Sequence, residues 1–299
     1  MLRHWGKRGL LVLVGLFGLW MAASSTSEVL MLHPRHWGVG PPPSARGWAY
    51  QDVAFKDPAG LTLRGWWIPG TNGATVVMVH GWTSSRREPY DKSQYLHDAG
   101  YNLLVFDLRG HGLSDGGYTT MGWREPEDVR AAVTLAKSLD PGPVALLGYS
   151  MGGASVLEEA AGDPRVAAVI EDSAFSSLSS VVAADFQHLT HLPAQPFDWA
   201  LLFVGQQDLH FQAGWVQPVR AAAQLRQPLL AIIGSADTTV PPAEGWSIYG
   251  AAAGPKQLLL VPGAGHTQAY NVAPAAYKAA VLGFLSRWLQ PAAASGQPA

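Results

Sequence analysis

The stretch Val144-Ala145-Leu146-Leu147-Gly148-Tyr149-Ser150-Met151-Gly152-Gly153 decides the fold of this chain. Its first four residues form an apolar run typical of a buried strand, and the small residues after Met151 favour a helix. The glycines on either side of Ser150 let the backbone turn sharply and pass close to its neighbours. A turn of this kind lifts the serine hydroxyl clear of the sheet edge. The sequence therefore predicts a strand, a tight turn and a helix, with Ser150 as a nucleophile at the turn.

Two further residues stand where a serine nucleophile needs them. Asp237 follows the apolar run from Pro228 to Ile233, and His266 follows the run from Gln257 to Val261. A serine hydroxyl is a poor nucleophile until a histidine takes its proton and a carboxylate fixes the histidine's tautomer. Open α/β sheets place functional residues just past the carboxyl ends of their strands. We therefore expect His266 to be the general base and Asp237 the acid that orients it.

The rest of the chain alternates short apolar runs with helical stretches, which predicts a doubly wound, mostly parallel sheet. The expected strands are Tyr50 to Phe55, Leu61 to Ile68, Ala74 to Val79, Tyr101 to Phe106, Val144 to Leu147, Val166 to Ile170, Leu229 to Ile233 and Gln257 to Val261. The clearest helices are Glu127 to Leu139, Gly152 to Ala161, Ala243 to Ala252 and Ala273 to Leu289. The turn Asp57-Pro58-Ala59-Gly60 joins the first two strands into an expected antiparallel pair.

The ordered motifs resemble those of the α/β-hydrolase superfamily. The resemblance rests on His80-Gly81-Trp82, on Asp107 to Ser114 and on Gly148 to Gly153, and it covers residues 48–290. Within the superfamily the chain is most similar to membrane-anchored or secreted serine hydrolases that are acylglycerol-lipase-like or dienelactone-hydrolase-like. The resemblance implies an α/β-hydrolase fold with about eight strands and a helical cap insertion.

The resemblance also gives roles to residues around the nucleophile. It implies that the backbone N–H groups of Trp82 and Met151 form an oxyanion hole. It leaves Asp172 as an alternative to Asp237, because some members supply the acid from the strand that ends near Ile170. His80 and His111 are expected to organise loops.

Three groups of surrounding residues complete this picture. Trp82, Tyr149 and Phe175 are the expected substrate-binding side chains. Arg86, Arg87 and Tyr90 follow the oxyanion loop and are expected to be mainly solvated, with contact to a polar head group as the alternative. Residues 173–227 are expected to form the cap, because this stretch is far longer than one crossover helix requires.

The N-terminus is typical of an exported protein. Arg3, Lys7 and Arg8 precede an uncharged apolar stretch, so residues 1–27 are interpreted as a signal peptide or an N-terminal membrane anchor. Residues 28–47, which include Pro41-Pro42-Pro43, are expected to be an extended linker. The catalytic domain, residues 48–290, would then lie outside the cytoplasm, either anchored or released to the periplasm or medium by cleavage. Residues 291–299 are expected to be a disordered tail.

Composition excludes several classes of function. The formal net charge is −2 and no long basic run occurs, which argues against nucleic acid as a partner. There is no cysteine, so disulfides, thiolate metal sites and cysteine nucleophiles are excluded. No His-Glu-x-x-His or comparable ligand spacing appears, so neither a metal nor another cofactor is expected.

The sequence thus predicts a serine hydrolase that cleaves small-molecule carboxylic esters or thioesters with small to medium acyl chains, through an acyl-enzyme. A serine peptidase and an acyltransferase on the same fold remain alternatives. A membrane-anchored binding protein that has kept the fold without the chemistry is a third.

Overall fold

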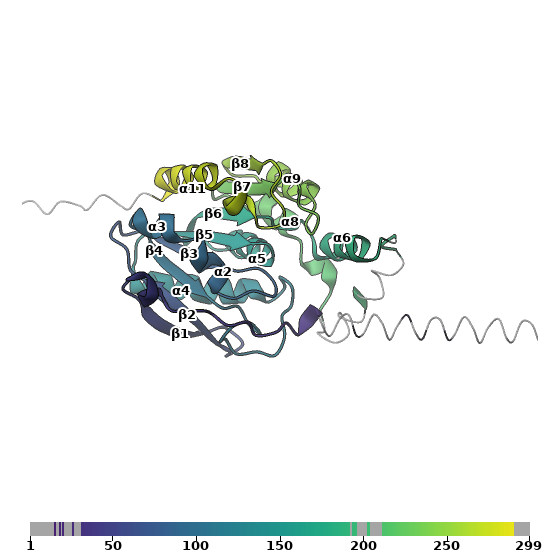
Figure 1. Ribbon diagram of the computed structural model, residues 1–299, viewed down its shortest axis with the longest axis horizontal. Helices are drawn as coiled ribbons and strands as arrows, with labels where there is room; N and C mark the ends of the chain where they lie inside the picture. Colours follow the sequence, from purple (N-terminus) through teal and green to yellow (C-terminus); the bar gives the residue numbers. More distant parts are fainter. Residues whose placement is uncertain are drawn as a thin grey trace, which may run out of the picture.

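Eight short strands form one sheet in the order β1-β2-β4-β3-β5-β6-β7-β8 (Figure 1). The strands are β1 (Gln51–Lys56), β2 (Thr62–Ile68), β3 (Thr75–Val79), β4 (Asn102–Phe106), β5 (Val144–Tyr149), β6 (Val166–Asp172), β7 (Leu229–Gly234) and β8 (Lys256–Val261). β2 runs antiparallel to β1 and β4, and every other neighbouring pair is parallel. The predicted fold class, a mostly parallel doubly wound sheet, is therefore confirmed.

The computed structural model describes residues 31–191, 193–195, 202–203 and 211–289, and the single positions 15, 18, 20 and 26. Its α-helices are α2 (Arg87–Asp91), α3 (Gln94–Asp98), α4 (Glu125–Leu139), α5 (Met151–Ala160), α6 (Leu178–Thr190), α8 (Pro218–Gln224), α9 (Pro242–Ala251), α10 (Ala269–Val272) and α11 (Pro274–Trp288). Two short 3-10 helices, η1 (Pro43–Arg46) and η2 (Ala213–Trp215), also lie within these ranges.

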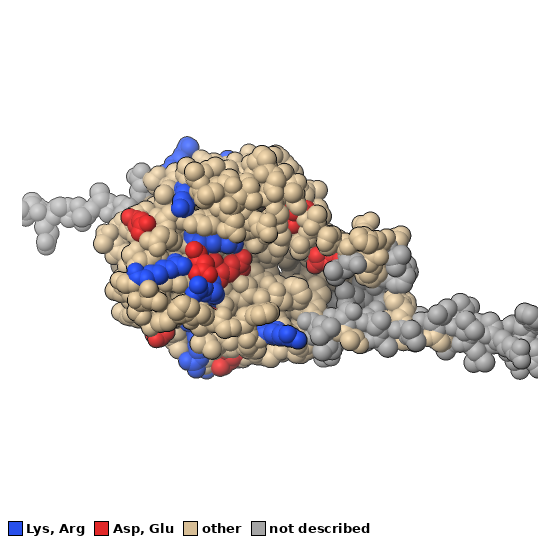
Figure 2. Space-filling view, in the orientation of Figure 1, with Lys and Arg blue, Asp and Glu red and all other residues tan. Residues whose placement is uncertain are grey.

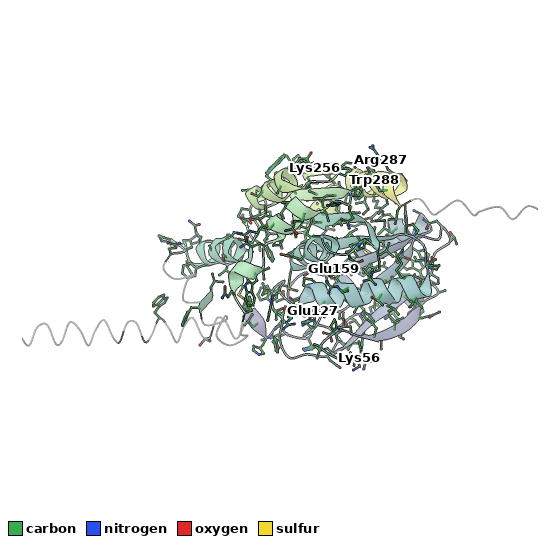
Figure 3. All side chains as sticks on the ribbon, turned by 180° about the vertical axis from the view of Figure 1, so that it is seen from behind. Lys56, Glu127, Glu159, Lys256, Arg287 and Trp288 are labelled. Carbon is green, nitrogen blue, oxygen red and sulfur yellow. The ribbon has the colours of Figure 1, made fainter. Side chains whose placement is uncertain are left out.

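Helices cover both faces of the sheet, and the alternation of side chains along the strands gives each face its own core. Val77 and Leu146 point to the face covered by α4, α5, α8 and α9. Met78 and Leu147 point to the opposite face, where α2, α3 and α11 pack. Seen from behind, Glu127 and Glu159 mark the neighbouring helices α4 and α5 (Figure 3). Because both faces are buried, the central strands read as continuous apolar runs in the sequence.

The described part of the expected cap consists of α6, η2 and α8. Helix α6 begins after Ser177, whose hydroxyl caps the helix by accepting the Ser180 N–H, and it projects to one side of the sheet (Figure 1). The carboxylate of Glu244, at the start of α9, accepts hydrogen bonds from the Ser176 and Ser180 hydroxyls. These bonds tie the first turn of α6 to the body of the domain. Residues 192, 196–201 and 204–210 of the same stretch lie outside the described residues.

The segment expected to be an extended linker lies against the domain. The Thr119 N–H donates to the Leu32 carbonyl over 2.8 Å, and the His36 ring lies within hydrogen-bond distance of the Gly112 carbonyl. Leu32 is buried in the core on the α4 and α5 side. Further along, Arg46 bonds Asp91 of α2. We define the docked segment as residues 31–40.

Within the described residues, no helix combines the length and apolar character needed to cross a bilayer. Most of residues 1–27, which are expected from the sequence to be a signal peptide or anchor, lie outside the described residues, as does the expected tail at 291–299.

Candidate active site

Ser150 occupies the turn between β5 and α5. Its backbone has φ 52° and ψ −118°, a conformation that non-glycine residues rarely adopt. The Ser150 N–H donates to the Asp172 carbonyl of β6 over 2.9 Å, which ties the turn to the neighbouring strand. The result is a hydroxyl group presented at the carboxyl end of the sheet, which is the geometry that the sequence predicts.

The flanking glycines are needed for this turn because other backbone passes very close to them. A Cβ atom on Gly152 would lie 2.5 Å from the carbonyl oxygens of Val79 and His80. A Cβ atom on Gly148 would collide with the backbone of Gly152 and Gly153. Any side chain at these positions would therefore push α5 away from β3 and β5.

His266 lies in the loop after β8 with its ring between two partners. Its Nε2 is 2.8 Å from Ser150 Oγ, and its Nδ1 is 2.8 Å from Asp237 Oδ2. The His266 side chain is 23% exposed, so part of it remains in contact with solvent. The structure thus brings together three residues that are separated by up to 116 positions in the sequence.

Asp237 is buried, with a relative exposure of 5%, in the loop after β7. Its second oxygen, Oδ1, accepts the N–H groups of Thr239 and Val240 over 3.0 Å and 2.9 Å. These bonds hold the carboxylate with Oδ2 directed at His266. An acceptor at Nδ1 requires that nitrogen to carry the proton, which leaves Nε2 free to accept the proton of Ser150.

Asp172, the alternative acid, has different surroundings. It is fully buried at the end of β6, and the Ser173 hydroxyl donates to its Oδ1. Burial raises its pKa above the usual aspartate value, with Lys92 as the main opposing influence. His266 is hydrogen-bonded to Asp237, so the geometry favours Asp237 as its partner.

Two backbone N–H groups adjoin the serine. Met151 begins α5, and Trp82 lies in the loop after β3, where a Cβ atom on the preceding Gly81 would be 3.3 Å from Ser150 Cβ. Among the hydrogen bonds of the described residues, neither the Trp82 nor the Met151 backbone N–H has an acceptor. The Trp82 indole N–H is separate from this backbone group and donates to the Met31 carbonyl of the docked segment over 2.9 Å.

The two loop histidines are buried and contact each other, with ring centroids 5.0 Å apart. Both ring nitrogens of His80 are used: Nε2 accepts the Leu108 N–H, and Nδ1 is 2.7 Å from the Gly81 carbonyl. Burial lowers the pKa of both rings, that of His111 to about 4. At neutral pH they are therefore uncharged. The loops after β3 and β4 are joined by the bond from the Leu108 N–H to His80 and by the contact between the two rings.

The residues that follow the loop after β3 differ from the expectation of a solvated surface. Arg86 is only 2% exposed and forms a buried ion pair with Asp107 over 2.6 Å. The Tyr90 ring is also buried, against Trp66. Arg87 comes nearest to the expectation, since it forms a partly exposed ion pair with Asp91. A single sequence did not reveal the arginine–carboxylate pairing that buries Arg86.

The three expected substrate-binding side chains differ in accessibility. Trp82 is half-buried and packs against the apolar cluster of the α4 and α5 face. Phe175 is 1% exposed in that cluster. Tyr149 is fully buried on the opposite face, with its hydroxyl 3.4 Å from that of Tyr277. Tyr149 therefore packs beneath the turn in the core of the opposite face. It does not lie where the sequence predicts a substrate contact, because the pleat of β5 directs its side chain away from Ser150.

Two carboxyl groups near the site were not anticipated. Asp185, on α6, is half-buried, and desolvation raises its pKa to about 6, although the charge of His266 opposes this shift. Glu171, on β6, is fully buried, and desolvation raises its pKa to about 8, although it accepts the Ala174 N–H. Asp185 lies in the expected cap with no motif around it, so sequence alone gives no signal of its electrostatic interaction with His266.

Figure 2 shows a face that is largely uncharged, with one central cluster of acidic and basic side chains and other charged side chains scattered around it. No group of three or more His, Cys, Asp or Glu side chains within the described ranges is arranged to hold a metal ion.

Comparison with known proteins gives consistent results. A model of the Alpha/beta hydrolase family matches residues 76–280. An uncharacterised protein of Mycobacterium tuberculosis is 32% identical over 235 residues, covering 76% of each chain. The uncharacterised Escherichia coli protein YfhR is 28% identical over 243 residues, covering 78% of this chain and 77% of its own. Among solved structures, the Pyrococcus furiosus esterase Pf2001 superimposes with a TM-score of 0.72 at 27% identity, covering 87% of this chain and 98% of the esterase.

Proposed function

Because this chain belongs to the alpha/beta hydrolase family, we propose that it hydrolyses carboxylic esters or thioesters with Ser150 as the nucleophile. The observation that carries the proposal is the position of one ring. His266 lies 2.8 Å from Ser150 Oγ on one side and 2.8 Å from Asp237 Oδ2 on the other. The similarity to the Pyrococcus furiosus esterase supports the ester class.

In the proposed reaction, Ser150 Oγ attacks the substrate carbonyl carbon while His266 Nε2 takes the hydroxyl proton. The oxyanion of the tetrahedral intermediate is held by the Trp82 and Met151 N–H groups. Collapse of the intermediate expels the alcohol or thiol, which leaves with the proton from His266. Water then attacks the acyl-enzyme, gives its proton to His266, and the carboxylic acid departs as Ser150 regains its proton.

We propose acyl chains of small to medium length as substrates. The half-buried rings of Trp82 and Trp123 pack against the apolar cluster that contains Phe175. Apolar surface of this kind favours an aliphatic acyl group over a charged one.

The test is hydrolysis of p-nitrophenyl esters of increasing acyl length by the full chain. We expect measurable turnover with an optimum at a short or medium acyl chain. Replacement of Ser150→Ala should reduce kcat by at least about 1,000-fold. The matched control is Ser247→Ala, which removes an exposed hydroxyl from α9 and should leave kcat unchanged. Absence of turnover by folded wild-type protein would direct attention to peptide bonds, acyl transfer or non-catalytic binding.

We further propose that residues 1–27 direct the chain to export and that the catalytic domain lies outside the cytoplasm. The support is the order of residues alone, with basic residues before an apolar stretch. Protease digestion of intact cells and of spheroplasts tests this location. Digestion only after lysis would contradict it.

A further inference from the structure

An ion pair on α2 joins the two loops that carry the site. Glu88 and Lys92 are four residues apart, and Lys92 Nζ lies 3.2 Å from Glu88 Oε1. Both side chains are largely removed from solvent, with relative exposures of 18% and 11%. This burial distinguishes the pair from Arg87 and Asp91 on the same helix, whose side chains are 35% and 42% exposed.

The acidic end of the pair holds the oxyanion loop. Glu88 Oε2 accepts the Gly81 N–H over 3.0 Å. Gly81 precedes Trp82 directly and lies against Ser150, so a shift of Gly81 moves the Trp82 N–H relative to the serine. Burial raises the pKa of Glu88, but Lys92 and the Gly81 N–H outweigh that effect and keep the pKa below its usual value. Glu88 is therefore a carboxylate at neutral pH.

The basic end holds the loop of the general base. Lys92 Nζ donates to the Thr267 carbonyl over 3.1 Å, across 175 positions of sequence. Thr267 follows His266 directly and has φ 52°, a conformation that its surroundings must impose. Its N–H is also fixed, because it donates to Ser173 Oγ over 3.1 Å. The ammonium group lies 4.1 Å from the centroid of the Tyr149 ring, which fixes it above β5.

We propose that Glu88 and Lys92 are positioning residues that set the distance between the oxyanion hole and the general base. Among the hydrogen bonds and ion pairs of the described residues, none joins the pair to Ser150 or His266, so the pair acts through Gly81 and Thr267. The Trp82 N–H and the His266 ring must both move little during attack, because misplacement of a catalytic group by about 1 Å can lower the rate about 100-fold. This inference rests on the proposed function.

The first variant is Lys92→Met, which keeps an unbranched apolar stem but loses the bonds to Glu88 and Thr267. We expect kcat for a p-nitrophenyl ester to fall about 10- to 100-fold, while KM changes by less than about 2-fold. Lys92→Arg retains a donor and a positive charge and should recover part of the lost kcat. Concentrations of folded enzyme are normalised by circular dichroism and thermal melting before kcat is compared.

The matched control is Arg87→Met, which removes the more exposed ion pair of the same helix. Its kcat and KM should stay within about 2-fold of wild type. Wild-type kinetics for folded Lys92→Met would overturn the proposal, as would a rise in KM with kcat unchanged.

If Lys92→Met does not fold, the kinetics of Glu88→Gln test the positioning role instead. The amide oxygen can still accept the Gly81 N–H, while the charge opposite Lys92 is lost. A lower kcat at unchanged KM supports the proposal, and wild-type kinetics overturn it.

Ser150→Ala distinguishes failure of the proposed function from failure of the positioning role. If that variant keeps wild-type activity, the proposed function fails, whereas an inactive Ser150→Ala beside wild-type kinetics for the Lys92 and Glu88 variants rejects the positioning role alone.

Discussion

Ser150 holds a backbone conformation that costs free energy. A non-glycine residue at φ 52° and ψ −118° is strained by about 1–3 kcal/mol. The strain persists because the turn is held on both sides by β5 and α5 and by the hydrogen bond from the Ser150 N–H to the Asp172 carbonyl. The proposed chemistry uses the strain, since it directs Oγ toward His266.

Asp185 should tune the pH dependence of the reaction. Its pKa is raised to about 6, so it becomes negatively charged as pH rises through that value, near His266. A negative charge nearby stabilises the positive charge that His266 carries while it holds the Ser150 proton. Asp185→Asn should therefore lower kcat/KM more at pH 7.5, where the Asp185 carboxyl is charged, than at pH 5, where it is protonated. Asp52→Asn, at an exposed position of β1, is the control. Equal effects of Asp185→Asn on kcat/KM at the two pH values would contradict this role.

Glu171 should make the fold less stable as pH rises. Burial raises its pKa from 4.5 to about 8, so the folded state holds a proton that the unfolded chain has released. Stability attributable to this group is complete below about pH 4.5 and declines as pH approaches 8. Glu171→Gln should match wild type near pH 5 and exceed its free energy of unfolding at pH 7.5, by at most about 3 kcal/mol. Urea titrations at both pH values measure this, and an equal difference at the two would refute the assignment.

At the scale of elements, the approach of α5 to β3 depends on Gly152. A Cβ atom there would lie 2.5 Å from two carbonyl oxygens, so Gly152→Ala must displace the helix or the strand. We expect a loss of about 1–3 kcal/mol in the free energy of unfolding. Gly283→Ala is the control, because its Cβ on α11 meets nothing within 4 Å and should add up to about 1 kcal/mol. Equal effects in chemical denaturation would show that close packing at Gly152 does not limit stability.

The elements that sequence predicts best are those whose pattern is local. All eight expected strands form, and β6 extends to Asp172 because that residue pairs with Tyr149 of β5. Short helices such as α2 and α3 have no amphipathic repeat long enough to be recognised. Ion pairs such as Arg86 with Asp107 join residues 21 positions apart, and a single sequence carries no signal for such pairing.

The candidate site was predictable to a similar degree. Ser150, Asp237 and His266 follow recognisable strand ends, and the structure places them in hydrogen-bond contact. Asp185 and Lys92 could not be assigned, because their positions depend on how α6 and α2 pack. The prediction that Tyr149 contacts substrate is not matched by its position, because its side chain points to the other face of the sheet.

At the scale of the whole molecule, the docked segment of residues 31–40 couples the N-terminal region to the site. Leu32 is 5% exposed and the neighbouring Met31 carbonyl accepts the Trp82 indole N–H. Leu32→Ser should lower the free energy of unfolding by about 2–4 kcal/mol. Trp37→Ser, at a site 53% exposed, should change it by less than about 0.5 kcal/mol. Thermal and urea denaturation measure both, and similar values would argue against docking.

The whole arrangement gathers residues from the loops after β3, β5, β7 and β8 at one edge of the sheet. That edge is where parallel sheets carry their functional residues. The central claim is that Ser150 is the nucleophile and that His266 activates it.

The most direct test is labelling of the full chain by a fluorophosphonate, followed by peptide mass spectrometry. The account predicts a single phosphonyl adduct on Ser150, no adduct in Ser150→Ala, and much slower labelling in His266→Ala. An adduct on another residue, or no adduct on folded wild-type protein, would contradict it.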